Sequence, residues 1–418
     1  MVVGRRDWLL GTGALGGALA CRAPTRPEVE YALVGQTPER GHLLRSGELL
    51  QRPITRRSKT KVAIVGGGAS GLSAAWWLRR QGLALDDMLL FELEPALGGT
   101  ARGGQMPRSA HPMGAHYLPT PPPELVELEA LLEDLGVLVG RDAQGRPEWQ
   151  ATAICAAPGE RHFFASQWHP GLYPEQGQSQ AEADQWARFW DQLRFLDRAR
   201  DGEGELLFRL PVRRCANQMR ALDRISMQQW LDERRLTSWR LRWYVDYACR
   251  DDYGCGIDHC SAFAALHHFL ARGLETTESA GRGGEGREGV LLTWPEGNGH
   301  LITKMDAQLG LGDQRRLDHL VCAIDAERGE LRVHDCVGDQ TSLVEAEVIL
   351  WAAPRYLLPH VLARGSDLLP AGALTYAPWL VANLELGKAP AGVGALLAWD
   401  NVPVFEDGVA HDLGYVVA

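Results

Sequence analysis

The stretch KVAIVGGGASG, residues 61–71, decides the fold class of this chain. It opens with four apolar residues, VAIV at 62–65, which predict a short buried strand. Three glycines with the spacing GxGxxG follow, at Gly66, Gly68 and Gly71, and a run of helical character comes directly after them. A strand, a glycine turn and a helix in this order predict the phosphate-binding turn of a dinucleotide-binding domain.

Each position of this turn has a mechanical reason. Gly66 permits the tight turn, Gly68 lets a pyrophosphate approach the backbone, and Gly71 lets the helix pack closely on the strand. Ala69 and Ser70 open the helix, where free N–H groups and the helix dipole favour an anion. These five residues are therefore predicted to belong to the binding site of a cofactor, with its phosphates on the helix N-terminus.

A second predicted strand, MLLF at 88–91, ends at Glu92, about twenty residues past the glycines. A carboxylate at this point of the fold accepts hydrogen bonds from a ribose. Glu94 lies two residues beyond the strand end and is the less favoured ribose ligand. The alternative interpretation is a structural glycine-rich turn with a solvent-facing Glu92.

The bulk composition is that of a folded protein with more than one core. The chain has 418 residues, of which 45% are apolar and 23% charged. This length exceeds one ordinary core and predicts two domains. The net charge of −10 argues against nucleic acid as a partner, because binding of phosphates requires a basic face.

Residues 1–21 resemble a Tat-type signal peptide. Arg5 and Arg6 are the twin arginines, Trp8 stands where that motif usually has Phe, and an apolar run too short to span a membrane follows. We therefore expect export by the Tat machinery, to the periplasm or to a membrane-anchored position outside the cytoplasmic membrane. Cys21 resembles a weak lipobox cysteine, so a lipid anchor and plain cleavage both stay open.

Three of the eight cysteines, Cys249, Cys255 and Cys260, lie close together in the sequence. Their spacing, Cys-x5-Cys-x4-Cys, is not that of a standard zinc site. A structural thiol or one local disulfide is favoured over a metal ion. No metal-ligand spacing or Ser-His-Asp arrangement competes with the nucleotide motif, so we expect no metal.

Four segments carry a resemblance to a known family: the glycine turn, Glu92 with the pair Gly98-Gly99, GAHY at 114–117, and WPEGNG at 294–299 with VILWAAP at 348–354. Together they resemble the FAD-dependent amine oxidase superfamily, the flavin-containing amine oxidoreductases that also include phytoene-desaturase-like flavoproteins. The spacing from Glu92 to the glycine pair is typical of this flavin group. The resemblance extends over about 61–354 and is weak in the helical middle.

The resemblance implies FAD as the cofactor. It adds these cofactor-binding residues: Gly98, Gly99, Arg102, Gly114, Ala115, His116 and Pro354. Arg102 would contact the pyrophosphate, although many relatives place this arginine two positions earlier, and a surface arginine is the alternative. His116 would touch the flavin or face the substrate, and a buried, hydrogen-bonded histidine without a catalytic role is equally favoured.

The resemblance also implies an α/β fold. We expect a Rossmann-like FAD-binding domain with a parallel sheet, interleaved with a second α+β substrate domain. The predicted segments are a signal peptide at 1–21, a linker at 22–60, a first FAD-binding segment at 61–148, a helical substrate or cap domain at 149–288, a second FAD-binding segment at 289–360, and a substrate-domain sheet at 361–418.

The catalytic residues are not fixed by these motifs, and three side chains are candidates: His116, Tyr117 and Asp246. Asp246 belongs to an acidic group with Asp251 and Asp252. This group would bind a cationic substrate, or it would form an internal ion-pair cluster with Arg242 and Arg250. We slightly favour the ion-pair cluster.

Two departures from the family bear on the reaction. Classical amine oxidases carry a lysine beside flavin N5, whereas the corresponding stretch here, WLVANLEL at 379–386, has none and Lys388 lies past its end. This argues against oxidase-type reactivity with dioxygen. Nothing after 353 resembles the family's segment that closes over the flavin, so we expect the sequence to stop before that segment.

The sequence therefore predicts an exported FAD-dependent oxidoreductase that transfers a hydride from a small-molecule substrate to flavin N5. An amine or polyamine is the leading substrate, on the resemblance alone, and the sequence does not identify the electron acceptor. The alternatives are a desaturase or isomerase of an apolar substrate, and a non-catalytic flavin-binding or assembly protein.

Overall fold

The computed structural model describes residues 32, 34–122, 124–155, 159–208, 210, 217–271, 291–362, 375–390, 392–405 and 412–417. All helices and strands given below belong to one compact unit, Gln36–Ala418. The predicted signal peptide at 1–21 lies outside the described residues.

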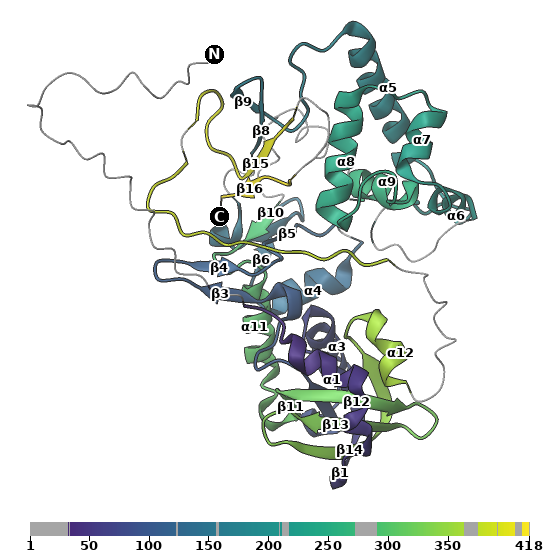
Figure 1. Ribbon diagram of the computed structural model, residues 1–418, viewed down its shortest axis with the longest axis vertical. Helices are drawn as coiled ribbons and strands as arrows, with labels where there is room; N and C mark the ends of the chain where they lie inside the picture. Colours follow the sequence, from purple (N-terminus) through teal and green to yellow (C-terminus); the bar gives the residue numbers. More distant parts are fainter. Residues whose placement is uncertain are drawn as a thin grey trace, which may run out of the picture. The chain divides into compact units, whose positions relative to one another are not determined.

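A six-stranded sheet contains the strand that leads into the glycine turn, and its strand order is β11-β2-β1-β14-β13-β12 (Figure 1). Its strands are β1 (Ile54–Val65), β2 (Met88–Phe91), β11 (Arg315–Arg316), β12 (His319–Asp325), β13 (Glu330–Asp335) and β14 (Gln340–Trp351). The pairs β11/β2, β2/β1 and β1/β14 are parallel, and β14/β13/β12 are antiparallel. The predicted α/β fold with a Rossmann-like, mostly parallel sheet is confirmed.

Both faces of this sheet are covered, as the continuous apolar run of its central strand requires. One face of β1, with Val62 and Ile64, packs against α3 (Ala69–Arg80) and α11 (Gly299–Leu309) (Figure 1). Ala63 and Val65 alternate to the other face, which α12 (Leu358–Val361) covers. Short 3-10 turns lie at Leu85–Asp87, Gly99–Ala101, Ala151–Ala153, Gly312–Gln314 and Arg355–Leu357.

The predicted linker at 22–60 is wrong for its C-terminal portion. Helices α1 (Pro38–Ser46) and α2 (Glu48–Gln51) form there, and β1 begins at Ile54 instead of 61. No residue of α1 is fully buried, so it lacks the apolar periodicity by which a helix is recognised in a sequence. The first half of β1 is polar, and pairing with β14 keeps it extended.

The Trp-rich middle of the chain is a helical layer, as predicted. It consists of α5 (Gln180–Asp197), α6 (Asn217–Asp223), α7 (Met227–Glu233), α8 (Trp239–Tyr253) and α9 (Ala262–Leu270). Buried aromatic rings, among them Trp190, Trp230 and Trp243, form its core. The sequence signal for the start of α7 is confirmed, because Ser226 and Gln229 form a reciprocal capping box.

Smaller sheets connect distant segments. The sheet β16-β15-β8-β9 joins β8 (Glu160–Phe164) and β9 (Gln167–Pro170) to β15 (Asp400–Pro403) and β16 (Tyr415–Val416). Region 149–288 is therefore not wholly helical, and its strands pair with the C-terminal region. Residues 375–390 form no helix or strand.

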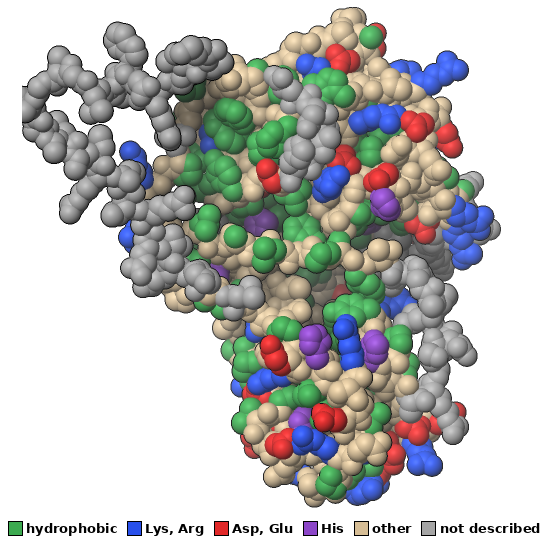
Figure 2. All heavy atoms as spheres, viewed as in Figure 1, with side chains coloured by type: hydrophobic (Ala, Val, Ile, Leu, Met, Phe, Trp, Pro, Cys, Tyr) green, Lys and Arg blue, Asp and Glu red, His purple; other side chains and the backbone are tan. Residues whose placement is uncertain are grey.

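The remaining elements are short strands and one further helix. They are β3 (Gly103–Gln105), β4 (Ala110–Pro112), β5 (Tyr117–Pro119), α4 (Val126–Asp134), β6 (Leu138–Arg141), β7 (Pro147–Trp149) and β10 (Leu291–Thr293). Strands β5 and β10 pair antiparallel, which joins the stretches of chain on either side of the helical layer. Acidic and basic side chains are interspersed over the face drawn in Figure 2.

Candidate functional site

The glycine turn between β1 and α3 is sterically closed at two of its glycines. Gly66 has φ +109°, and a Cβ there would lie 2.9 Å from the Ala352 backbone. A Cβ on Gly71 would lie 1.9 Å from the carbonyl oxygen of Gly66. The tight turn and the close helix packing that the sequence predicts for these positions are therefore both present.

Gly68 differs, because a Cβ there would meet nothing closer than 3.8 Å. It faces the loop with Gly98 and Gly99, since the Gly98 N–H donates to the Gly67 carbonyl oxygen at 2.9 Å. Ala69 and Ser70, the first residues of α3, are exposed. The helix N-terminus and two glycine backbones thus form an open cradle that suits an anion.

Glu92 stands at the end of β2 directly beside this cradle. Its carboxylate accepts the Gly67 N–H at Oε2 (2.7 Å) and the Glu94 N–H at Oε1 (2.9 Å). Burial raises the pKa of Glu92, while these two hydrogen bonds and Arg102 oppose the shift. Each oxygen keeps acceptor capacity for a further donor.

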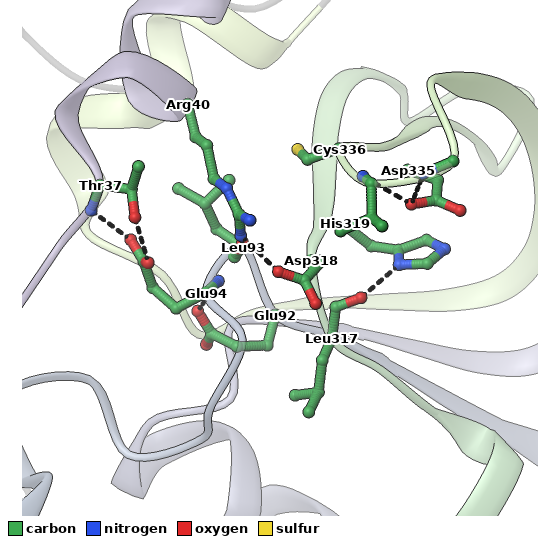
Figure 3. A network of polar contacts seen from close by, with 12 residues as sticks. Thr37, Arg40, Glu92, Leu93, Glu94, Leu317, Asp318, His319, Asp335 and Cys336 are labelled. Carbon is green, nitrogen blue, oxygen red and sulfur yellow. Dashed lines mark hydrogen bonds and ion pairs between the residues drawn. The ribbon is translucent and has the colours of Figure 1, made fainter.

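Glu94 points to other partners. Both of its carboxylate oxygens accept hydrogen bonds from Thr37 (Figure 3), each at 2.7 Å. Its oxygens thus have donors within the protein, which favours Glu92 over Glu94 as the ribose ligand.

Arg102 lies against the glycine pair. A Cβ on Gly98 would come 2.6 Å from the Arg102 Cγ. Within the described part of the chain, the Arg102 Nε is buried and has no hydrogen-bond partner. A buried guanidinium donor without an acceptor calls for an anion, and the cradle beside it would hold one. The residue as a whole is half-buried.

The segment Gly114–Tyr117 passes between the glycine loop and the WPEGNG segment. Its Ala115 N–H donates to the Thr100 carbonyl (3.3 Å), and the Asn298 backbone N–H donates to the Ala115 carbonyl (3.0 Å). Gly114 has no room for a side chain, because a Cβ would lie 2.8 Å from the Thr100 oxygen. The fold therefore brings together three segments that the sequence singled out at distant positions.

Pro354 lies at the edge of this arrangement. The contact with the glycine turn is made two residues earlier, by Ala352, whose N–H donates to the Val65 carbonyl at 2.8 Å. Pro354 itself is exposed and precedes a short 3-10 turn.

His116 is packed between aromatic rings. It stacks on Trp399 with ring centroids 5.6 Å apart and meets Tyr117 edge-on at 4.9 Å. Burial lowers the pKa of His116, against a hydrogen bond with the Gly114 backbone. His116 is therefore neutral near pH 7. Trp399 carries no sequence signal that links it to this site.

Two buried carboxyl groups were missed by sequence reasoning. Glu160 of β8 and Asp400 of β15 are direct partners across paired strands. Burial, and then repulsion from Asp400 and Asp251, raises the pKa of Glu160 to about 8. Burial and Asp251 raise the pKa of Asp400 to about 7.

Two further side chains lie near this pair, the phenol of Tyr247 and the carboxyl group of Asp251. Tyr247 of α8 has its pKa raised by burial and by Asp251, Asp400, Glu160 and Tyr117. Portions of both acidic residues reach the surface, but the Glu160 Oε2 is shielded and has no hydrogen-bond partner among the described residues. We call Glu160, Asp400, Asp251 and Tyr247 the acidic cluster.

Asp246 does not belong to the acidic cluster. Its carboxylate accepts hydrogen bonds from Arg250 (2.6 Å) and from the Ile257 N–H (2.9 Å), which fixes the turn after α8. Asp252 pairs with His268 at 2.6 Å. These contacts favour the ion-pair interpretation for Asp246 and Asp252, whereas Asp251 belongs to the acidic cluster. Arg242, expected in the same ion-pair cluster, pairs with Asp232 instead.

The three neighbouring cysteines meet at the turn between α8 and α9. Each is a free thiol in the structure. Hydrogen bonds from Cys249 and then Cys255 lower the pKa of Cys260. The thiol interpretation therefore holds here, and the local disulfide is not formed.

A scan of family models matches residues 64–135 to an NAD(P)-binding Rossmann-like domain. No curated protein matches the chain. Among solved structures, wild-type putrescine oxidase bound to putrescine is 18% identical, with a TM-score of 0.52 over 73% of this chain and 60% of that one. Cyclohexylamine oxidase from Brevibacterium oxydans IH-35A is 17% identical, with a TM-score of 0.52 over 75% and 61%. The chain has the fold of these amine oxidases.

This amine oxidase fold is shared by a protein of different chemistry. A fatty acid isomerase from P. acnes is 16% identical, with a TM-score of 0.50 over 74% of this chain and 62% of that one. The chain spans about three-fifths of the length of all three structures. In the part of the chain that the structure describes, no helix is long and apolar enough to cross a membrane.

Proposed function

We propose that this protein is a FAD-dependent oxidoreductase of the amine oxidase type. The amine oxidase fold and the Rossmann-like domain support an oxidoreductase with a nucleotide cofactor. When bound, FAD would supply a flavin N5 that accepts a hydride from a substrate carbon.

The residues present fit FAD at the cradle. The exposed N-terminus of α3 and the backbones of Gly68 and Gly99 would hold the pyrophosphate. Arg102 would give its unpartnered Nε–H to the same group, and Glu92 would accept from a ribose hydroxyl. Segment 114–117 would line the ring, with His116 as a neutral imidazole.

The acidic cluster carries the substrate proposal. The two carboxyl groups lie side by side near Tyr247, which in turn lies near Tyr117. His116, the neighbour of Tyr117, stacks on Trp399, the residue before Asp400. A carboxylate held out of water without a donor is costly, and an ammonium group would relieve that cost. The aromatic rings beside it also favour a cation. We therefore propose an amine with at least one positively charged group as the substrate.

Anaerobic reduction of the bound flavin tests this function. Bleaching of the yellow absorbance by a diamine or a cycloalkylamine, and not by an unsaturated fatty acid, supports it. The Glu160→Gln and Asp400→Asn variants should need about tenfold more amine for the same rate, since hydrogen bonds to charged groups contribute about 1.5–3 kcal/mol. Glu133→Gln, an exposed acid of α4, is the matched control.

Two other outcomes would replace the proposal. Conversion of an unsaturated fatty acid without net flavin reduction would favour an isomerase, the activity named for the P. acnes structure. A bound flavin that no compound reduces would favour a non-catalytic flavin-binding or assembly role. The absence of lysine from residues 379–386 makes this second outcome worth testing.

Export by the Tat machinery belongs to the proposal. It is supported by Arg5 and Arg6 ahead of an apolar run, and by the need to load a cofactor before transport. A periplasmic fraction that loses the protein on Arg5→Lys plus Arg6→Lys substitution would support it. Radiolabelled palmitate incorporated at Cys21 would decide between an anchor and cleavage.

A further inference from the structure

The N-terminal arm, Gln36–Ser46, contacts the loop that carries Glu92. We propose that Thr37 and Arg40 of this arm are positioning residues for Glu92, so that docking of the arm and binding of the nucleotide are coupled. The inference rests on the proposed role of Glu92 as a ribose ligand.

Polar contacts hold much of the arm. No residue of α1 is fully buried, and Leu43 and Leu44 are only partly buried against a small cluster with Leu49 and Leu320. An amphipathic helix docks mainly through its apolar face, and here that face is narrow. Specific hydrogen bonds must therefore supply much of the docking.

Thr37 makes the first of these contacts. Its N–H and its hydroxyl donate to the two oxygens of Glu94, each at 2.7 Å (Figure 3). Threonine at a helix N-cap normally accepts a hydrogen bond from the first turn, but here its side chain makes no such bond. Glu94 is 7% exposed, so the loss of Thr37 would leave a buried carboxylate short of donors.

Arg40 makes the second contact and joins two chain segments. It donates to the carbonyl oxygen of Leu93 and to Asp318 Oδ1, both at 2.6 Å (Figure 3). The Asp318 N–H in turn donates to the Glu94 carbonyl at 3.2 Å, and the His319 N–H donates to the Glu92 carbonyl at 2.8 Å. The guanidinium thus ties the two loops together around residues 92–94.

Glu94 connects Thr37 of the arm to Glu92 at the proposed cofactor site. The Glu94 N–H donates to Glu92 Oε1, and the other oxygen of Glu92 holds the Gly67 N–H of the glycine turn. Any shift of Glu94 moves that donor, so the arm orients the carboxylate that would meet the ribose. By thermodynamic reciprocity, a nucleotide that binds Glu92 must also stabilise the docked arm.

The affinity of the apoprotein for FAD, measured by quenching of flavin fluorescence, tests the first half of this coupling. Thr37→Val and Arg40→Gln should each raise Kd about tenfold, the usual size of such coupling. Thr37→Ser, which keeps the hydroxyl, should bind FAD like the wild type. His42→Gln, an exposed change on the same helix, is the matched control.

Proteolysis tests the second half. Trypsin cleavage after Arg45 of the wild type, followed by mass spectrometry, should slow on addition of FAD and should be faster in Arg40→Gln. If the wild type binds FAD but both arm variants bind it equally well, the coupling is wrong and the proposed function stands. If the wild type binds no FAD while Thr37→Val still speeds cleavage, the arm docks as described but the cofactor assignment and the coupling both fail.

Discussion

Glu160 and Asp400 face each other across the parallel strands β8 and β15, with their carboxyl groups drawn out of water. The pKa of Glu160 is about 8 and that of Asp400 about 7. Both values lie above the ordinary range of carboxyl groups, because burial and repulsion from Asp251 disfavour the ionised forms, and Asp400 adds to the repulsion on Glu160. Ionisation of this pair should therefore lower the stability of the fold, and a bound cation should restore it.

The first prediction concerns stability against pH. A carboxyl group whose pKa is raised in the folded state binds its proton more tightly there than in the unfolded chain. Its contribution to the unfolding free energy is complete below about pH 4 and is lost as the pH rises toward 7 to 8. The thermal midpoint of the wild type should therefore fall between about pH 5 and 8 more steeply than that of Glu160→Gln plus Asp400→Asn. Circular dichroism melts in this range measure it.

A bound amine gives the matching control for this pair. A diamine should raise the midpoint of the wild type at pH 8 and leave the double variant unchanged, since an ammonium group compensates the ionised carboxylates. Parallel curves for the two proteins at all pH values would contradict the burial of this pair.

The second prediction contrasts two glycines of the same turn. Gly71→Ala should cost about 2–3 kcal/mol of unfolding free energy, because its Cβ would overlap the Gly66 carbonyl oxygen. Gly68→Ala should change stability by less than about 0.5 kcal/mol and still weaken FAD binding, because its Cβ meets only the open cradle. Urea unfolding and flavin occupancy separate the two effects. Equal stability losses would show that the cradle is not open.

The strand, glycine turn and helix could be predicted because their sequence pattern is local, whereas the ribose role of Glu92 stays a prediction. Gly71 packs against the turn itself, at the carbonyl oxygen of nearby Gly66, and the strand before the turn ends in an apolar run. The acidic cluster could not be predicted, because Glu160 and Asp400 meet only through the pairing of two strands that lie far apart in the sequence. Its other acid, Asp251, stands out in the sequence only as a member of a charged run.

The arm shows a different limit. Helix α1 has too little apolar surface to reveal a helix, and its docking depends on single hydrogen bonds to Glu94 and Asp318. Asp246 illustrates the opposite case, in which a conspicuous carboxylate has its partners nearby in the chain, at Arg250 and Ile257. Composition alone does not separate such structural acids from acids that await a ligand.

The third prediction concerns Arg102. Arg102→Gln removes the buried donor that has no acceptor in the described part of the chain. FAD affinity should fall about tenfold to a hundredfold, the size expected for a charge-assisted hydrogen bond, with little change in the melting temperature of the apoprotein. Arg80→Gln, which breaks an exposed pair with Asp134, is the control and should leave FAD affinity unchanged. An unaltered affinity in Arg102→Gln would place the pyrophosphate elsewhere.

The fourth prediction concerns His116, whose pKa is lowered chiefly by burial. Trp399→Leu should open the stack on one side of the imidazole and raise its pKa toward the ordinary value of about 6.5. Since the wild-type imidazole stays neutral in the fold, acid should destabilise the wild type through this group below about pH 6.5, and the variant less so. An NMR titration of labelled histidine follows the pKa directly. Trp379→Leu, at a tryptophan that is 53% exposed, serves as the control and should leave the titration unchanged. A His116 that titrates identically in the wild type and in Trp399→Leu would mean that Trp399 does not shield it, and the stack of His116 on Trp399 would no longer support the proposed substrate site.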